Sequence, residues 1–239
     1  MKKISLLVLC FFCVNLVCGQ EKSSEKEKKK EQIEKKSQQF APVLFKDRIV
    51  LDFFSSTWFG LDEGIKQKAV NFGFHGAIMF DLPVKKNSPI SFGLGVGVTN
   101  NNLYSNALWS IGENYTTVMS PVPEGIKYRK NKITFTNINI PLEFRYRHSS
   151  GFKISAGARV GLMADIHSKY FGSALNGSDD KTLIKDYKIP NRTRIPVEFT
   201  FKTGWKFVSV NVSYMITKMF TADSPQINTV SFGVTLCPY

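Results

Sequence analysis

The chain has 239 residues, of which 13% are aromatic and 17 are glycine, and its formal net charge is +13 at pH 7. This length suits one domain, and the aromatic and glycine content is typical of β-rich rather than helical proteins. The positive charge favours anionic partners, but the chain has neither a basic helix nor an aromatic-basic module, so we expect no nucleic-acid partner.

The N-terminus is typical of a secretory signal peptide. Two lysines precede an apolar run over residues 4–17, which Gly19 ends. The run is shorter than the roughly twenty apolar residues that a membrane-spanning helix needs. We therefore expect the chain to be exported and residues 1–19 to be removed. Lipidation of Cys18 is the alternative, which we disfavour because the residues before it are not small.

Residues 20–46 are rich in charge and poor in apolar side chains. Within them, EKSSEKEKKKEQIEKK at 21–36 contains one aliphatic residue, Ile33, so a helix here would have no face to bury. We expect a solvated periplasmic spacer, with a specific docking arm as the alternative. Removal of the leader leaves Cys237 as the only cysteine, and no Cys/His cluster has metal-ligand spacing, so we expect no disulfide, metal or cofactor.

From residue 48 onward apolar and polar residues alternate, which is the main sequence signal for strands. The pattern is clearest at 152–166, where even-numbered residues are apolar and odd-numbered residues are mostly small, polar or charged. The alternation predicts strands at 49–59, 72–82, 92–98, 138–146, 152–166, 195–201, 208–216 and 230–236. Eight is the smallest usual number of strands in a closed transmembrane barrel. We therefore assign residues 47–239 to one barrel domain.

Alternation alone does not tell which face points outward, because a soluble ligand-binding barrel would have its apolar face inside. The polar face contains seven glycines, which make room in a narrow interior: Gly73, Gly93, Gly95, Gly97, Gly157, Gly161 and Gly233. The apolar face carries more bulky side chains than such an interior can hold. We therefore expect an all-β, eight-stranded antiparallel transmembrane barrel, with apolar residues facing lipid and no unpaired sheet edge in the hydrocarbon.

The lengths of the connections indicate the orientation of this barrel. Outer-membrane barrels have short periplasmic turns and longer outer loops. Starting in the periplasm, the connections at 83–89, 148–151 and 204–206 are short, and those at 100–130 and 167–191 are long. This order predicts an outer-membrane location with both ends of the barrel domain in the periplasm.

Several segments resemble the PorT-like outer-membrane β-barrel proteins of Bacteroidota. They are RIVLDFFSSTWFG at 48–60, FGFHGAIMFDLPV at 72–84, FGLGVGVTNNNLYSN at 92–106, KNKITFTNINIPLEFRYR at 130–147 and FKISAGARVGLMADIHSKY at 152–170. The resemblance covers nearly all of 48–236, and it implies a small integral barrel of the outer membrane. The member that gives the family its name is tied to the type IX secretion pathway. We carry over the fold and location and keep secretion as an alternative role.

The inward positions carry many charges. They are Asp52, Asp81, Glu143, Arg145, Arg147, Lys153, Arg159, Asp165, Arg194, Glu198 and Lys202. An eight-stranded barrel is just wide enough for its own side chains to fill it, and buried charges need partners. We therefore expect a structural charge network across the lumen, with an ion-selective pore as the alternative.

The predicted outer loops carry cations that we expect to contact the phosphates of lipopolysaccharide. The candidates are Lys127, Arg129, Lys130, Lys132, Lys169, Lys188 and Arg192, with Lys181 and Lys185 in the same loops.

We expect no catalytic residues in this chain. A lipid A deacylase would place a serine and a histidine together on the outside of the barrel, but His167 and Ser168 are adjacent and so point to opposite faces of a strand. His75 points inward and His148 lies in a periplasmic turn. The sequence therefore predicts a non-enzymatic outer-membrane barrel with an envelope structural or interaction role. A type IX secretion accessory is the alternative, and a pore or a lipid A-modifying enzyme is less favoured.

Overall fold

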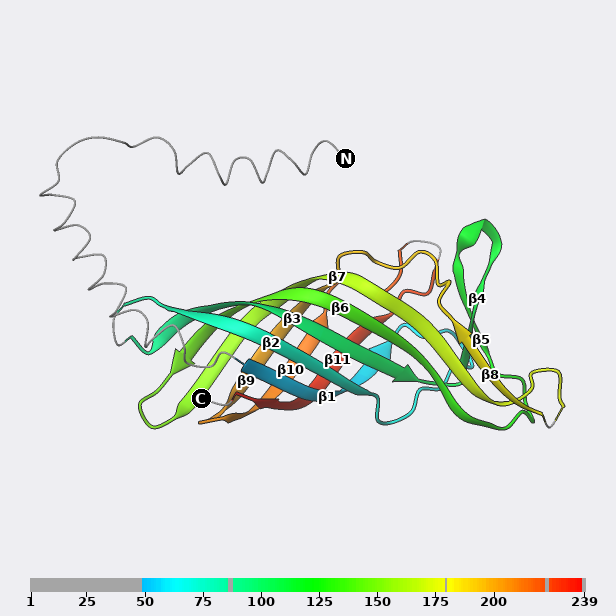
Figure 1. Cartoon of the computed structure of the whole chain (residues 1–239), viewed down its shortest axis with the longest axis horizontal. Coiled ribbons are helices and arrows are strands. Elements are labelled where there is room, and N and C mark those ends of the chain that lie inside the picture. Colours follow the sequence, from blue (N-terminus) through cyan, green and yellow to red (C-terminus); the bar gives the residue numbers. More distant parts are fainter. Residues whose placement is uncertain (1–48, 86–87, 179, 222–223, 238–239) are drawn as a thin grey trace, which may run out of the picture. The chain divides into compact units, whose positions relative to one another are not determined.

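The computed structural model describes residues 49–85, 88–178, 180–221 and 224–237 (Figure 1). The predicted signal peptide (1–19) and spacer (20–46) lie outside the described residues. Where apolar and polar residues alternate, the chain forms strands, because β-branched and aromatic side chains pack well on a pleated surface. Among the described residues, no helix is long and apolar enough to cross a membrane.

Eight antiparallel strands close into a barrel. Their order is β6-β3-β2-β1-β11-β10-β9-β7, and β7 pairs back with β6. The strands are β1 (Ile49–Phe59), β2 (Phe72–Pro83), β3 (Ile90–Tyr104), β6 (Tyr128–Arg147), β7 (Phe152–Ser173), β9 (Val197–Trp205), β10 (Val208–Met215) and β11 (Asn228–Leu236). The predicted eight-stranded antiparallel barrel is thereby confirmed.

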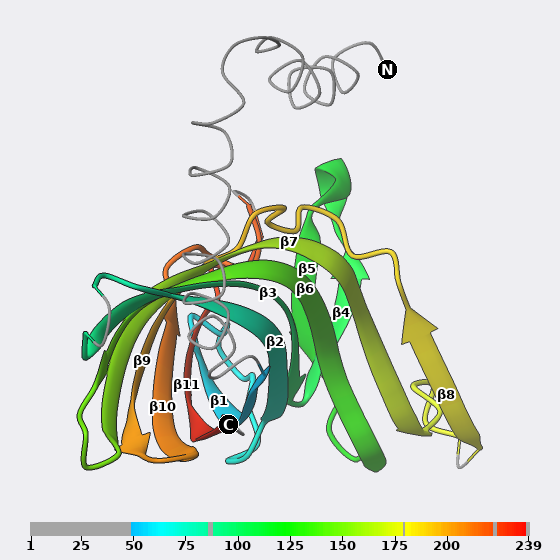
Figure 2. The same cartoon turned by 60° about the vertical axis from the view of Figure 1, so that its left-hand side comes forward.

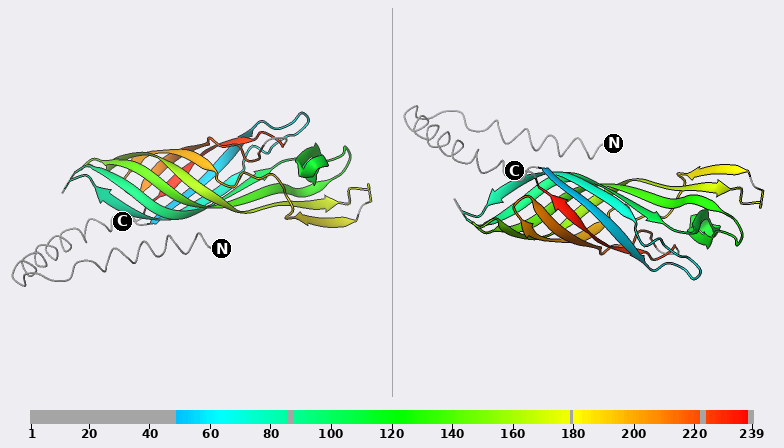
Figure 3. Two further views of the ribbon diagram at one scale, coloured as in Figure 1. Left: turned by 90° about the horizontal axis from the view of Figure 1, so that it is seen from above. Right: turned by 90° about the horizontal axis from the view of Figure 1, so that it is seen from below.

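Three further strands lie at one end of this barrel. The hairpin of β4 (Ala107–Ile111) and β5 (Thr117–Pro121) forms a separate two-stranded sheet around a short 3-10 turn, Glu113–Tyr115. The third, β8 (Lys181–Asp186), extends the main sheet by pairing with β7. Figures 1 and 3 show these strands at the end of the barrel opposite the short turns.

The apolar face of the barrel points outward. On β3, Phe92, Leu94 and Val96 are exposed, with 59% of the Val96 surface accessible. Between them lie glycines, and the alternate residues Ser91 and Thr99 are buried. Every barrel strand repeats this arrangement over part of its length, which confirms the predicted orientation of the faces. The apolar band can therefore lie in hydrocarbon while the closed sheet satisfies its own backbone groups.

The short connections are at the predicted periplasmic end, where 84–89, 148–151 and 206–207 join consecutive barrel strands. Gly151 in one of these turns has φ +96°, a conformation that favours glycine. At the other end, the prediction of loops at 100–130 and 167–191 was wrong in part, because much of both segments is strand. β6 has 20 residues and β7 has 22, about twice the length that crosses a bilayer. Figure 2 shows both strands running past the rest of the barrel toward β4, β5 and β8.

The extended strands reverse their polarity beyond the apolar band. On β3, Val98 faces outward and is exposed, whereas Leu103, at an inward position, is fully buried. Its neighbour Tyr104 faces outward and pairs with Lys132 of β6. The same strand therefore presents apolar side chains to lipid along one part and to the barrel interior along the next.

A register shift between β6 and β7 changes the face of the residues that follow it. Asn137 pairs with Met163 and Thr136 pairs with Asp165, so Ala164 has no partner in this ladder. Such a bulge inserts one residue and reverses the alternation beyond it. Asp165 therefore faces outward and Ile166 is fully buried, whereas the sequence prediction placed Asp165 in the lumen and Ile166 among the lipid-facing residues.

The interior of the barrel is layered. Toward the outer end, large apolar side chains pack into a cluster that we call the outer core: Trp58, Leu103, Ala107, Trp109, Met119, Ile133, Phe135, Met163, Ile166, Ile189, Met215, Met219, Phe220 and Ile227. A smaller apolar cluster contains Val50 and Cys237. The inward positions of β1 run from Val50 through Asp52 to Trp58, so charged groups lie below the outer core.

Candidate functional site

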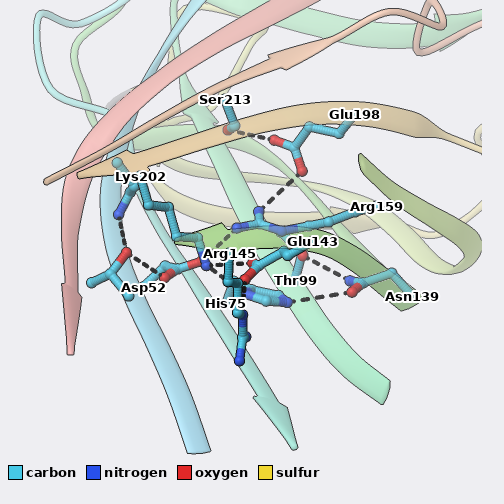
Figure 4. Close-up of polar contacts among 12 residues, drawn as sticks. Asp52, His75, Thr99, Asn139, Glu143, Arg145, Arg159, Glu198, Lys202 and Ser213 are labelled. Carbon is cyan, nitrogen blue, oxygen red and sulfur yellow. Dashed lines mark hydrogen bonds and ion pairs between the residues drawn. The ribbon is translucent and has the colours of Figure 1, made fainter. Parts of the chain in front are cut away.

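Asp52 lies at the centre of the charged part of the lumen. Its side chain is fully buried, because β1 points Asp52 inward together with Val50 and Phe54. Its Oδ2 accepts hydrogen bonds from Arg159 Nη2 at 2.5 Å and His75 Nδ1 at 2.9 Å. Its Oδ1 accepts a hydrogen bond of 2.7 Å from Thr235 Oγ1. Groups from β1, β2, β7 and β11 thus meet at one carboxylate, and Figure 4 shows Asp52 with His75 and Arg159 beside it.

Arg159 extends these contacts toward β9 and β10. Its Nη1 donates to Glu198 Oε2 at 3.1 Å, and Glu198 Oε1 accepts a hydrogen bond of 2.6 Å from Ser213 Oγ. On the other side, His75 Nε2 lies 3.3 Å from Asn139 Oδ1, whose Nδ2 donates to Thr99. Neutral side chains therefore complete the hydrogen bonding of the charged ones.

A second group of charges is joined to the first through Lys202. Its Nζ lies 3.4 Å from Asp52 Oδ2 and 3.0 Å from Glu143 Oε1. Arg145 Nε donates to Glu143 Oε2 at 2.9 Å, and Arg145 Nη1 lies 3.6 Å from Asp81 Oδ1. Asp81 also forms an ion pair with Arg147. Positive and negative groups thus alternate across the lumen.

These contacts join equal numbers of acidic and basic side chains, four carboxylates and four cations. We call this set the lumen network: Asp52, Asp81, Glu143 and Glu198 with Arg145, Arg147, Arg159 and Lys202. All but Arg147 and Glu198 are buried. Because an unpaired charge in such surroundings costs several kcal/mol, these ion pairs stabilise the charged interior.

Little free space remains inside this part of the barrel. One cavity, lined by Asn139, Arg159 and Glu198, has a volume of about 20 Å³. Another, lined by Glu143, Lys153 and Lys202, has a volume of about 30 Å³. Each can hold about one water molecule. Side chains, rather than a wide aqueous channel, fill the described lumen here.

Two of the eleven residues predicted for the lumen, Asp165 and Arg194, do not lie there. Lys153 is half-buried near the start of β7 and lines a cavity together with Glu143 and Lys202 of the network. Asp165 faces outward because of the bulge, and it accepts a hydrogen bond of 2.7 Å from His167 Nδ1. Arg194 is exposed and precedes β9, so strand alternation does not apply to it.

The lumen also contains polar residues that were not among the predicted site residues. His75, Asn139, Thr235 and Ser213 contact the network directly or through one another. They occupy the same inward positions as the charged residues on their strands, so strand alternation could have predicted that they face the lumen. Among the described residues, no group of three or more His, Cys, Asp or Glu side chains could hold a metal ion.

The predicted lipopolysaccharide contacts lie in three places at the outer end. Lys127 and Arg129 line a hollow of about 330 Å³ with Lys181. Lys188 and Arg192 line an open groove of about 1000 Å³, which also contains Arg194. Lys130, Lys132 and Lys169 lie on the outward face of β6 and β7. The predicted set is therefore not one site.

Comparison with known proteins gives one family match. The model of the family described as "Outer membrane protein beta-barrel domain" matches residues 52–221. No curated protein matches the chain.

Two similar solved structures are of Ail, the attachment invasion locus protein of Yersinia pestis. The first is 12% identical, covers 78% of this chain and 93% of that chain, and gives a TM-score of 0.39. The second, in complex with the heparin analogue sucrose octasulfate, is 10% identical with the same coverage and gives a TM-score of 0.37.

Proposed function

Because the chain belongs to the outer membrane protein β-barrel domain family, we propose that it is a non-enzymatic barrel with a structural or interaction role in the cell envelope. In this proposal the lumen network braces the barrel, and the outer end meets envelope partners. Residues 1–19 act as a cleaved signal peptide, and residues 20–46 form a periplasmic spacer before the barrel domain at 47–239. N-terminal sequencing of the protein from outer membranes tests the cleavage, which we expect after Gly19.

The observation that carries the proposal is the pairing of the buried charges in the lumen beneath the outer core. A conducting pore needs a hydrated path with charges available to ions, as in much wider barrels. Here four carboxylates and four cations engage one another, and large apolar side chains such as Trp58 and Phe135 fill the space above them. This arrangement supports a brace rather than a pore.

The outer end supports an interaction role. β6 and β7 continue beyond the length that a bilayer requires, and their outer parts carry several of the cations predicted to contact lipopolysaccharide. In this proposal the cations that contact lipopolysaccharide are Lys127, Arg129, Lys130, Lys132, Lys169, Lys188 and Arg192. Lipopolysaccharide is the anionic partner that surrounds an outer-membrane barrel at this level, and cations bind its phosphates through charge-assisted hydrogen bonds.

The experiment uses the protein folded from outer membranes and placed in a planar bilayer, with a water-filled porin as the positive control. We expect the unboiled protein to migrate differently from the boiled protein on a gel and to show no steady conductance in the bilayer. Conductance by a single folded barrel would overturn the sealed-lumen proposal. A protein that fractionates with the soluble periplasm would overturn the outer-membrane role.

A secretion role is the second candidate, and it rests on the resemblance of segments such as RIVLDFFSSTWFG at 48–60 to the PorT-like proteins of Bacteroidota. The two candidates differ in the phenotype of a deletion strain. Loss of export of many cargo proteins would support a part in type IX secretion. Normal export together with altered envelope sensitivity would support the structural or interaction role.

A further inference from the structure

Three lysines form a row across the outward face of the extended strands. Lys132 of β6 pairs with Lys169 of β7, which pairs in turn with Lys185 of β8. Tyr104 of β3 completes the row on the other side of Lys132. Residues that pair directly across antiparallel strands lie side by side on one face, and like charges in such positions repel. We call Lys132, Lys169 and Lys185 the lysine row.

Two more lysines approach the same place. The Nζ atoms of Lys68, Lys130 and Lys132 lie 6.0, 6.0 and 5.8 Å from the centre of the Tyr104 ring. The aromatic face attracts each ammonium weakly. Three cationic side chains therefore surround Tyr104, and Lys132, which belongs to both groups, joins them to the lysine row.

The lysine row lacks anionic partners within the described part of the chain. Asp165 is the acidic residue on the same face of β7, but its carboxylate accepts a hydrogen bond from His167 rather than pairing with a lysine of the row. Lys132 Nζ donates to the neutral Asn102 Oδ1, and Lys185 Nζ donates to the Tyr187 hydroxyl at 3.0 Å. Neutral groups thus solvate Lys132 and Lys185, and the charges of both remain available to an anion.

The pKa of Lys132 reflects this crowding. Burial, followed by the charges of Lys130, Lys169 and Lys185, lowers the pKa to about 8 from the usual 10.5. Lys132 lies outside the apolar band, so its environment is that of the headgroup region. A bound anion would offset the repulsion and raise the pKa of Lys132.

The position of the row relative to the apolar band limits what the anion can be. On β6 the outermost lipid-facing apolar residue is Ile138, and Lys132 lies six residues farther out, about 20 Å along the strand. With the usual tilt of barrel strands, this is about 15 Å above the hydrocarbon. That level contains the phosphorylated sugars of outer-leaflet glycolipids rather than their acyl chains.

We propose that the lysine row and its neighbours Lys68, Lys130 and Tyr104 bind the phosphate groups on the sugars of an outer-leaflet glycolipid. This inference rests on the proposed outer-membrane role and assigns its contact with phosphorylated lipid to one site, to which it adds Lys68, Lys185 and Tyr104. The exposed apolar residues below the site, including Phe72, Phe74 and Val98, then contact the acyl chains of the same lipid. The site combines a lipid-facing position with unpaired cations, and a phosphorylated glycolipid complements both features.

The test measures lipid retention by native mass spectrometry of the full exported chain. The probes are rough lipopolysaccharide, which contains lipid A and inner-core sugars, and the same material after removal of its phosphates. We compare wild type with Lys132→Gln/Lys169→Gln. The matched control is Lys85→Gln/Lys206→Gln, which removes the same charge from two exposed lysines in periplasmic turns. A gel shift on heating checks that each variant is folded.

We expect wild type and the control to retain phosphorylated lipopolysaccharide equally. Retention by the lysine-row variant should be weaker by about tenfold for each lysine removed. Equal retention of the phosphorylated and dephosphorylated forms by wild type would overturn the proposal, and this comparison needs no variant to fold. Displacement of the lipid by an equal concentration of inorganic phosphate would overturn the assignment to a glycolipid and indicate a site for free phosphate.

Failure of this inference can be separated from failure of the proposed function. Phosphate-dependent retention by a barrel that conducts ions would overturn the sealed lumen and support the lysine site. A non-conducting outer-membrane barrel without phosphate-dependent retention would overturn the lysine site alone.

Discussion

Lys202 joins the two halves of the lumen network, since its Nζ contacts both Asp52 and Glu143. We predict that Lys202→Met destabilises the folded barrel by about 3–5 kcal/mol, because two buried carboxylates lose a shared cation. Urea unfolding in detergent, followed by the gel shift, measures the change. The control Lys85→Met alters an exposed turn residue and should change stability by about 0.5 kcal/mol or less. Equal effects of the two substitutions would mean that the network does not brace the barrel.

The protonation of Lys132 should make both the stability of the barrel and its binding of lipid depend on pH. Burial is the first cause of its lowered pKa of about 8, and Lys130, Lys169 and Lys185 act in the same direction. Between about 8 and 10.5 the unfolded chain holds this proton and the folded chain does not, so Lys132 makes stability rise with pH in that window. The loss of its charge should, in turn, weaken binding of phosphorylated lipid as the pH rises through about 8.

An NMR titration of the Lys132 side chain checks this assignment. Replacing Lys169 by Gln removes one like charge and so should raise the pKa of Lys132 toward its ordinary value. Replacing Lys85 by Gln at the periplasmic end should leave the titration unchanged. A titration of Lys132 near 10.5 in wild type would contradict the crowding around it.

At the scale of single residues, strand alternation predicts much of the lumen. Asp52, Glu143 and Arg159 lie inward as the parity of their strands requires. Asp165 does not, because one unpaired residue, Ala164, reverses the parity beyond it. A bulge depends on how two distant strands pair, so a pattern within one strand could not reveal it.

At the scale of elements, the predicted strands stopped short of the outer parts of β3, β6 and β7 because the polarity of these parts is inverted. Ile138 faces lipid on β6, whereas Ile133 and Phe135 farther out face the interior. Where a strand leaves the hydrocarbon for water, its outward face becomes polar and its inward face becomes apolar. The apolar residues therefore change from even to odd positions, or from odd to even. A search for continuous alternation takes this change as the end of the strand.

The outer core should stabilise these extended strands. Phe135 is 2% exposed and packs edge-on against Trp58, with ring centres 5.4 Å apart. We predict that Phe135→Ala costs about 3–5 kcal/mol because it leaves a cavity in a packed cluster. The control Phe199→Ala truncates a lipid-facing side chain that is 58% exposed and should cost much less. Urea unfolding compares the two, and equal losses would contradict the packing role of the outer core.

At the scale of the whole molecule, the lengths of the connections predict the orientation of the barrel, and the short connections do lie together at one end. The topology predicts that Lys181 faces the outside of the cell and Lys206 faces the periplasm. We expect a membrane-impermeant maleimide to label Lys181→Cys on intact cells and Lys206→Cys only after the outer membrane is opened. The protein without either substitution still contains the buried Cys237, so its labelling measures the background. The reverse pattern of labelling would mean that the barrel is inverted.

The polarity inversion bears on how the barrel is built into the membrane. In the proposed orientation the turn at 148–151 between β6 and β7 stays in the periplasm, so the opposite ends of these two strands must cross the bilayer during insertion. Those ends carry Lys130, Lys132 and Lys169, and each lysine costs about 2–4 kcal/mol at the midplane of a bilayer. In that orientation we expect insertion of this protein to depend on local thinning of the membrane or on an insertion machine more strongly than insertion of a barrel whose outer strand ends are uncharged.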